Sequence, residues 1–204
     1  MPEGARVLNA EGKYLIPGLV DMHVHFSSGG LERRDSHTTE RVLQQFLFYG
    51  VTSVLNVGAT GGSPEDIVRI RTQQASGVVS GPRVYATGNM LTLPGSHPIA
   101  TIMQVPEGTD PETHDWTRRG VAVVETPGEA RVAVRRNSEQ GMDGIKMIIE
   151  AGNTFLGEPY PQMPPEMIRA VVDEAGDLPV FSHVSSLDEF LETASLETEA
   201  EAAP

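Results

Sequence analysis

Short apolar segments rich in β-branched residues recur along the chain and predict strands. The longer segments between them have apolar positions every three or four residues, which is typical of helices with one buried face. The five predicted strands are residues 19–26, 51–57, 83–87, 144–149 and 179–184. Alternation of strands and helices indicates parallel βαβ units, so the pattern predicts an α/β fold.

The intervening segments also carry recognisable helix ends. Ser63 and Thr126 each stand where an N-cap is expected, and each is followed by a proline in the first helical turn. Glycines stand where each helix would stop. The four predicted helices lie within residues 37–50, 63–77, 126–141 and 164–176.

Three segments fall outside this alternation. Residues 1–17 are typical of a short polar hairpin or sheet edge that leads into the first strand. Residues 91–119 are rich in proline and predict a long connection. In a compact domain, a connection of this length more often has a function than not. The acidic residues 193–204 predict a disordered tail.

Charge and composition exclude several classes of function. The chain has 204 residues, a formal net charge of −13 and no cysteine. It offers no basic patch for nucleic acid or for a membrane surface, and no apolar run approaches the roughly 20 residues of a membrane span. The start lacks the features of a signal peptide, so we expect a cytoplasmic protein. Without thiolates, any metal must be held by nitrogen and oxygen.

The motif "DMHVH" holds the first candidate ligands. Side chains alternate along a strand, so Asp21, His23 and His25 are expected on one face. Two imidazoles about 6 to 7 Å apart along a strand can converge on one ion. The alternative is that both are ordinary hydrogen-bonded histidines.

Two further residues strengthen the metal hypothesis. Lys146 lies in the middle of a predicted strand, where an unpaired ammonium group would be costly to bury. His183 lies near the end of another predicted strand. The carboxyl ends of the strands of a parallel barrel meet at one mouth, which would bring these residues together. Alternatively, Lys146 extends its ammonium group to solvent and His183 caps a helix.

These residues resemble a known family. The segments "YLIPGLVDMHVHF", "GVTSVLNVG", "GPRVYATG", "GIKMIIEAG" and "PVFSHVSS" resemble, in order, the first five barrel strands of the metal-dependent amidohydrolase superfamily, in particular its imidazolonepropionase-like and prolidase-like members. The resemblance implies an incomplete (β/α)8 TIM-type barrel of about five strands. Residues 18–192 would form this partial barrel, and residues 1–17 would be a remnant of a small N-terminal β-sandwich.

The resemblance also implies roles for the candidate residues. His23 and His25 would bind the more buried metal, Lys146 would be a carboxylated lysine bridging two metals, and His183 would bind the second metal. Asp21 would orient the site, unless it forms an internal salt bridge. His97 would contact substrate, unless it is a solvated loop histidine.

The implied reaction is hydrolysis of an amide C–N bond by a metal-bound hydroxide, with a small amide or dipeptide as substrate. Zinc is the first expectation for the metal, although manganese, cobalt and iron fit nearly as well; the intact family has two ions, and this chain would have one or none. Lys146 argues against a deaminase of the same superfamily, which would use one metal and no bridging lysine.

The sequence also departs from the family. The family takes another metal histidine from strand 6 and a catalytic aspartate from strand 8, but no histidine follows His183 and the only later aspartate is Asp188. A barrel of this kind needs eight strands, and a five-stranded arc leaves open sheet edges that invite self-association. Two hypotheses therefore stay open: a truncated metal-dependent hydrolase, or a catalytically inactive fragment that at most binds one metal ion or a partner chain.

Overall fold

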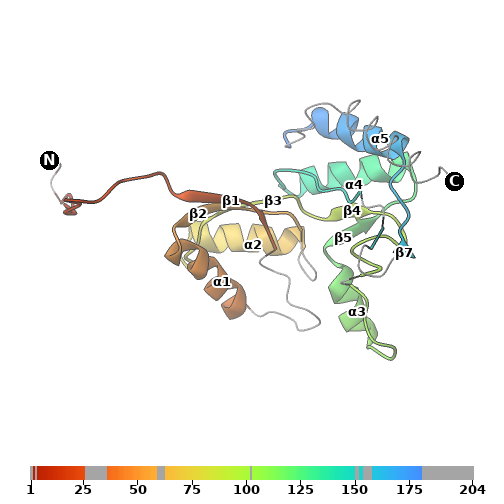
Figure 1. Cartoon of the computed structure of the whole chain (residues 1–204), viewed down its shortest axis with the longest axis horizontal. Helices are drawn as coiled ribbons and strands as arrows, with labels where there is room; N and C mark the ends of the chain where they lie inside the picture. The colour runs from red at the N-terminus through yellow and green to blue at the C-terminus, as the bar shows by residue number, and fades with distance from the viewer. Residues whose placement is uncertain are drawn as a thin grey trace.

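The computed structural model describes residues 2, 4–25, 36–58, 63–101, 103–149, 152–153 and 158–180. His183, the end of the fifth predicted strand and the acidic tail lie outside these residues. Figure 1 shows helices and short strands arranged along an elongated molecule. No helix in the described ranges is long and apolar enough to cross a membrane.

The first sheet contains three parallel strands in the order β1-β2-β3. They are β1 (Leu19–Val24), β2 (Val51–Asn56) and β3 (Arg83–Ala86), and their crossovers contain α1 (Ser36–Phe48) and α2 (Pro64–Ala75). Both helices lie on the same side of this sheet (Figure 1). The parallel βαβ units confirm the predicted α/β fold, and the first three strands begin at the predicted residues.

A second group of elements continues the chain. β4 (Met90–Thr92) pairs in parallel with β5 (Val121–Val123), and α3 (Pro111–Arg118) lies between them in sequence. The prediction that residues 91–119 form only a connection is therefore wrong. β4 is three residues long and wholly buried, and α3 has only eight residues, so neither is long enough to show a clear period.

The predicted strand at 144–149 is reduced to one parallel bridge between Leu91 and Met147. Two backbone hydrogen bonds support the bridge: the Leu91 N–H donates to the Lys146 carbonyl at 2.8 Å, and the Ile148 N–H donates to the Leu91 carbonyl at 2.9 Å. Just before this segment, the Asp143 N–H donates to the Ala86 carbonyl of β3 at 2.8 Å. The segment with Lys146 is thus tied to both β3 and β4.

In the described part of the chain, the last helices pack against the β4 segment and not against the first sheet. α4 (Pro127–Glu139) packs along α5 (Pro165–Gly176), and a short antiparallel pair, β6 (Gly152–Asn153) and β7 (Glu158–Pro159), lies between them in sequence. The predicted N-cap of α4 is confirmed, since the Glu129 N–H donates to the Thr126 hydroxyl at 3.2 Å.

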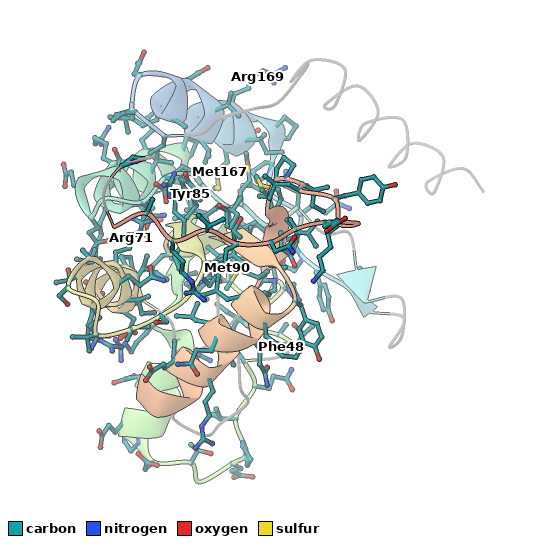
Figure 2. All side chains as sticks on the ribbon, turned by 90° about the vertical axis from the view of Figure 1, so that its left-hand side faces the viewer. Phe48, Arg71, Tyr85, Met90, Met167 and Arg169 are labelled. Atoms are coloured by element: carbon teal, nitrogen blue, oxygen red, sulfur yellow. The ribbon has the colours of Figure 1, made fainter. Side chains whose placement is uncertain are left out.

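The two largest clusters of buried apolar side chains in the described residues join strands to helices. One lies between the first sheet and helices α1 and α2, and comprises Val24, Leu43, Val54, Ile67, Ile70, Val84, Ala86 and Met142. The other joins β4 to α4 and α5, and comprises Leu91, Leu93, Val124, Ala130, Val134, Met163, Met167, Ile168, Val171 and Ala175. Met90 is buried near the middle of the molecule, whereas Phe48 lies at its periphery (Figure 2).

The segment before β1 extends away from this body (Figure 1). Its described residues, 4–17, include a turn in which the Lys13 N–H donates to the Ala10 carbonyl at 3.0 Å, but they form no strand. Tyr14 and Leu15 are almost fully exposed. The hairpin or sheet edge expected here is therefore absent from residues 4–17, and the assignment to a β-sandwich remnant stays a prediction.

Candidate metal centre

The end of β1 presents two histidines on the face of the sheet that the helices leave uncovered. Val24 is buried in the cluster beneath α1 and α2, whereas His23 and His25, on either side of it in sequence, are exposed. Since successive side chains of an extended chain point to opposite faces, both imidazoles lie on the face away from the helices.

The two imidazoles are close enough to bind a single ion. Their Nε2 atoms are 3.2 Å apart and their ring centroids are 5.1 Å apart. Two nitrogen ligands about 2.0 to 2.1 Å from a tetrahedral ion would be about 3.3 Å apart, so the observed spacing fits a shared metal. Without an ion, the same spacing fits an N–H···N hydrogen bond between the rings.

A carbonyl group just beyond the neighbouring strand fixes the proton on Nδ1 of His25. His25 Nδ1 lies 2.5 Å from the carbonyl oxygen of Gly58, just beyond β2. A carbonyl oxygen can only accept, so Nδ1 carries the proton and donates it. In the neutral ring the lone pair is then on Nε2, the atom that lies 3.2 Å from His23 Nε2.

The surroundings of His23 favour its neutral form. The pKa of His23 is lowered from its ordinary value, chiefly by desolvation and then by the positive charges of Lys146 and His25, while Asp21 acts in the opposite direction. A neutral imidazole is the form that binds metal. Asp21 also accepts a hydrogen bond from the backbone N–H of His23 at 3.1 Å, and so holds the strand that carries this ligand.

Lys146 belongs to the same electrostatic environment but comes from a distant segment. It is half-buried beside β4, and its charge acts on His23 across 123 residues of sequence separation (146 − 23). As a free ammonium group it would repel a metal ion, whereas a carboxylated lysine would supply oxygen ligands. Within the described ranges, no group of three or more histidine, cysteine, aspartate or glutamate side chains is placed to hold a metal.

His97 lies in the loop after β4 and makes contacts within that loop. Its Nδ1 atom is 2.7 Å from the Thr101 hydroxyl, and its carbonyl oxygen accepts a hydrogen bond from the Thr92 hydroxyl at 2.5 Å. These contacts hold the turn together, and the predicted contact with substrate stays a prediction. His183, for which a role as metal ligand is predicted, lies outside the described residues.

Asn56 and Arg71 were not predicted from the sequence. Asn56 is buried at the end of β2, where its amide faces the carbonyl oxygens of Val24 and Gly58. Arg71 of α2 forms an ion pair with Asp143, three residues before Lys146. A polar residue at the end of an otherwise apolar strand could have indicated Asn56, whereas Arg71 follows the ordinary pattern of an exposed helical position.

Comparison with known proteins shows the family of the chain. The model of the amidohydrolase family matches residues 14–201, nearly the whole chain. The chain belongs to the amidohydrolase family. This family membership confirms the resemblance that the strand motifs indicated.

Individual relatives in the family match only in part. A dihydroorotase from Pelotomaculum thermopropionicum is 36% identical over 86 residues, which are 42% of this chain and 19% of that enzyme. The crystal structure of a prolidase complexed with N-methylphosphonate-L-proline aligns with a TM-score of 0.65 at 26% identity, over 85% of this chain and 43% of that one. Molinate hydrolase aligns with a TM-score of 0.68 over 95% of this chain and 47% of its own, but at 24% identity this likeness shows the fold alone. The chain therefore spans less than half the length of these relatives.

Proposed function

We propose that this chain supplies the first strands of a metal-dependent amidohydrolase barrel, whose site hydrolyses a C–N bond of a small amide or dipeptide-like substrate. The observation that carries the proposal is the 3.2 Å spacing between the Nε2 atoms of His23 and His25 on the open face of a parallel sheet. The similarity to a prolidase complexed with N-methylphosphonate-L-proline and to a dihydroorotase supports this substrate class.

In this proposal each residue has a defined task. His23 and His25 hold one divalent ion through Nε2, with zinc as the first expectation because the donor set lacks sulfur. Lys146, once carboxylated, adds oxygen donors, and His183 holds a second ion. When bound, such ions lower the pKa of a water molecule and polarise the amide carbonyl. The Gly58 carbonyl keeps the His25 ring in the orientation and tautomer that ligation needs.

The second candidate is a catalytically inactive chain that binds at most one ion or a partner. This candidate concerns the 204 residues by themselves, which contain no histidine after His183 and no aspartate after Asp188 to act as the family's proton shuttle. Loss of a general base commonly costs about 10²- to 10⁴-fold in rate. The two candidates share the His23–His25 metal site and differ in turnover.

Zinc binding tests the shared site. Equilibrium dialysis against buffered zinc should show binding by the wild type, loss of that binding in His25→Ala and unchanged binding in His97→Ala, the matched histidine control. Bicarbonate should raise zinc stoichiometry in the wild type but not in Lys146→Met. A wild type that binds no zinc, or equal losses in both histidine variants, would refute the proposed site.

Turnover then separates the two candidates. The zinc-loaded chain should be assayed against a panel of dipeptides and cyclic amides, with His25→Ala as the negative control. Hydrolysis that depends on His25 would support the hydrolase, whereas zinc binding without hydrolysis would support the inactive chain.

A further inference from the structure

We propose that Asn56 is a positioning residue for the imidazole pair, acting on His25 through the carbonyl group of Gly58. The inference rests on the proposed function only in taking His23 and His25 as the metal site. It adds a residue on the neighbouring strand that decides which nitrogen of His25 faces the ion.

The amide of Asn56 joins the two strand ends that form the site. Asn56 is only 4% exposed, and its side-chain amide lies 3.0 Å from the Val24 carbonyl oxygen and 3.2 Å from the Gly58 carbonyl oxygen. Because both neighbours are acceptors, the NH₂ group must face them and donate to both. Val24 is the residue between the two histidines, so one amide holds the backbone of β1 and the turn after β2 together.

The backbone at Gly58 is restricted as well. Gly58 has φ +101°, a conformation that residues with a side chain rarely adopt, and an added Cβ would lie 2.7 Å from the Met90 sulfur. The Val57 N–H also donates to the Val24 carbonyl at 3.1 Å. The direction of the Gly58 carbonyl is thus set by a glycine conformation, by the buried Met90 and by the Asn56 amide.

These contacts connect Asn56 to the Nε2 atom of His25, the atom that would bind the metal. The Asn56 amide and the His25 Nδ1–H group both donate to the Gly58 carbonyl oxygen, which leaves the His25 Nε2 lone pair facing His23. Hydrogen bonds to the second nitrogen of a ligating histidine fix its tautomer and orientation, and their loss typically lowers metal affinity about 10- to 100-fold. Asn56 stabilises the acceptor of such a hydrogen bond.

A matched pair of buried asparagines gives the test. Asn137 of α4 is 2% exposed and bonds the backbone of Asn89 through both ends of its amide, at 2.9 and 3.1 Å. Asn56→Leu and Asn137→Leu each remove two hydrogen bonds from a buried amide while keeping the side-chain shape. Circular dichroism and urea midpoints would show how far each variant is destabilised.

Two readouts distinguish positioning from general stability. The ¹⁵N chemical shifts of the His25 ring in the metal-free protein report its tautomer, and zinc titration reports affinity. In Asn56→Leu we expect a mixture of tautomers and zinc binding about 10- to 100-fold weaker. In Asn137→Leu we expect the wild-type tautomer and affinity.

Each outcome decides the inference. An unchanged His25 tautomer in Asn56→Leu, or equal effects in the two variants, would overturn it. If Asn56→Leu does not fold, Asn56→Ser serves instead, because its short hydroxyl cannot reach both carbonyl oxygens, and an unchanged tautomer there would also overturn it. A wild type that binds no zinc would refute the proposed function, while the tautomer measurement would still test Asn56.

Discussion

The ion pair between Arg71 and Asp143 is expected to make a large contribution to stability. The Arg71 guanidinium donates to the Asp143 carboxylate, to the Gly141 carbonyl at 2.7 Å and to the Val84 carbonyl at 3.0 Å. The same carboxylate accepts the Ala86 N–H at 2.8 Å. One side chain of α2 therefore ties β3 to the start of the segment that carries Lys146.

The size of this contribution to stability follows from the number of hydrogen bonds and from the solvent exposure of the two side chains. Arg71→Met removes the three hydrogen bonds of the guanidinium group and takes away the positive charge beside the Asp143 carboxylate. A hydrogen bond to a charged group contributes about 1.5 to 3 kcal/mol. The two side chains are 28% and 27% exposed, so solvent screens part of this energy. We expect Arg71→Met to lower the free energy of unfolding by about 2 to 4 kcal/mol.

Urea denaturation of the metal-free protein measures this loss, and α4 offers a matched control. Arg135 donates to Glu174 at 2.7 Å, but its side chain is 45% exposed, so Arg135→Met should cost at most about 1 kcal/mol. Arg71→Lys should not restore stability, because one ammonium group cannot reach three acceptors. Equal losses in Arg71→Met and Arg135→Met would refute the reasoning.

Two further predictions concern pH and association. Because the pKa of His23 lies below its ordinary value of 6.5, the unfolded chain takes up this proton at a higher pH than the folded chain. The stability of the metal-free protein should therefore fall as pH drops below 6.5, and His23→Gln should reduce this slope in urea midpoints. Self-association through the open edge of the sheet stays a prediction. Three apolar residues of the edge strand β1, Leu19, Val20 and Met22, are 54% to 64% exposed. Sedimentation should therefore show dimers that Val20→Lys disrupts, and a wild type that is monomeric at all concentrations would contradict the prediction.

Local chemistry explains which parts of the fold could be predicted. The starts of α2 and α4 follow from an N-cap residue and a proline, which act within one turn of helix. The first three strands follow from short apolar runs. β4 and α3 were missed because each is too short for its periodicity to stand out, and the strand at 144–149 was overestimated because an apolar run does not show how many partners it will pair with.

The sequence by itself determined that His23 and His25 share a face, because alternation along a strand is a local property of the backbone. Only the tertiary structure decided what that face can do. The proton on His25 is placed by Gly58, 33 residues away, and the segment of Lys146 is held by an ion pair across 72 residues. Such contacts depend on how strands and helices pack, and hydrophobic periodicity carries no information on which distant atoms will meet.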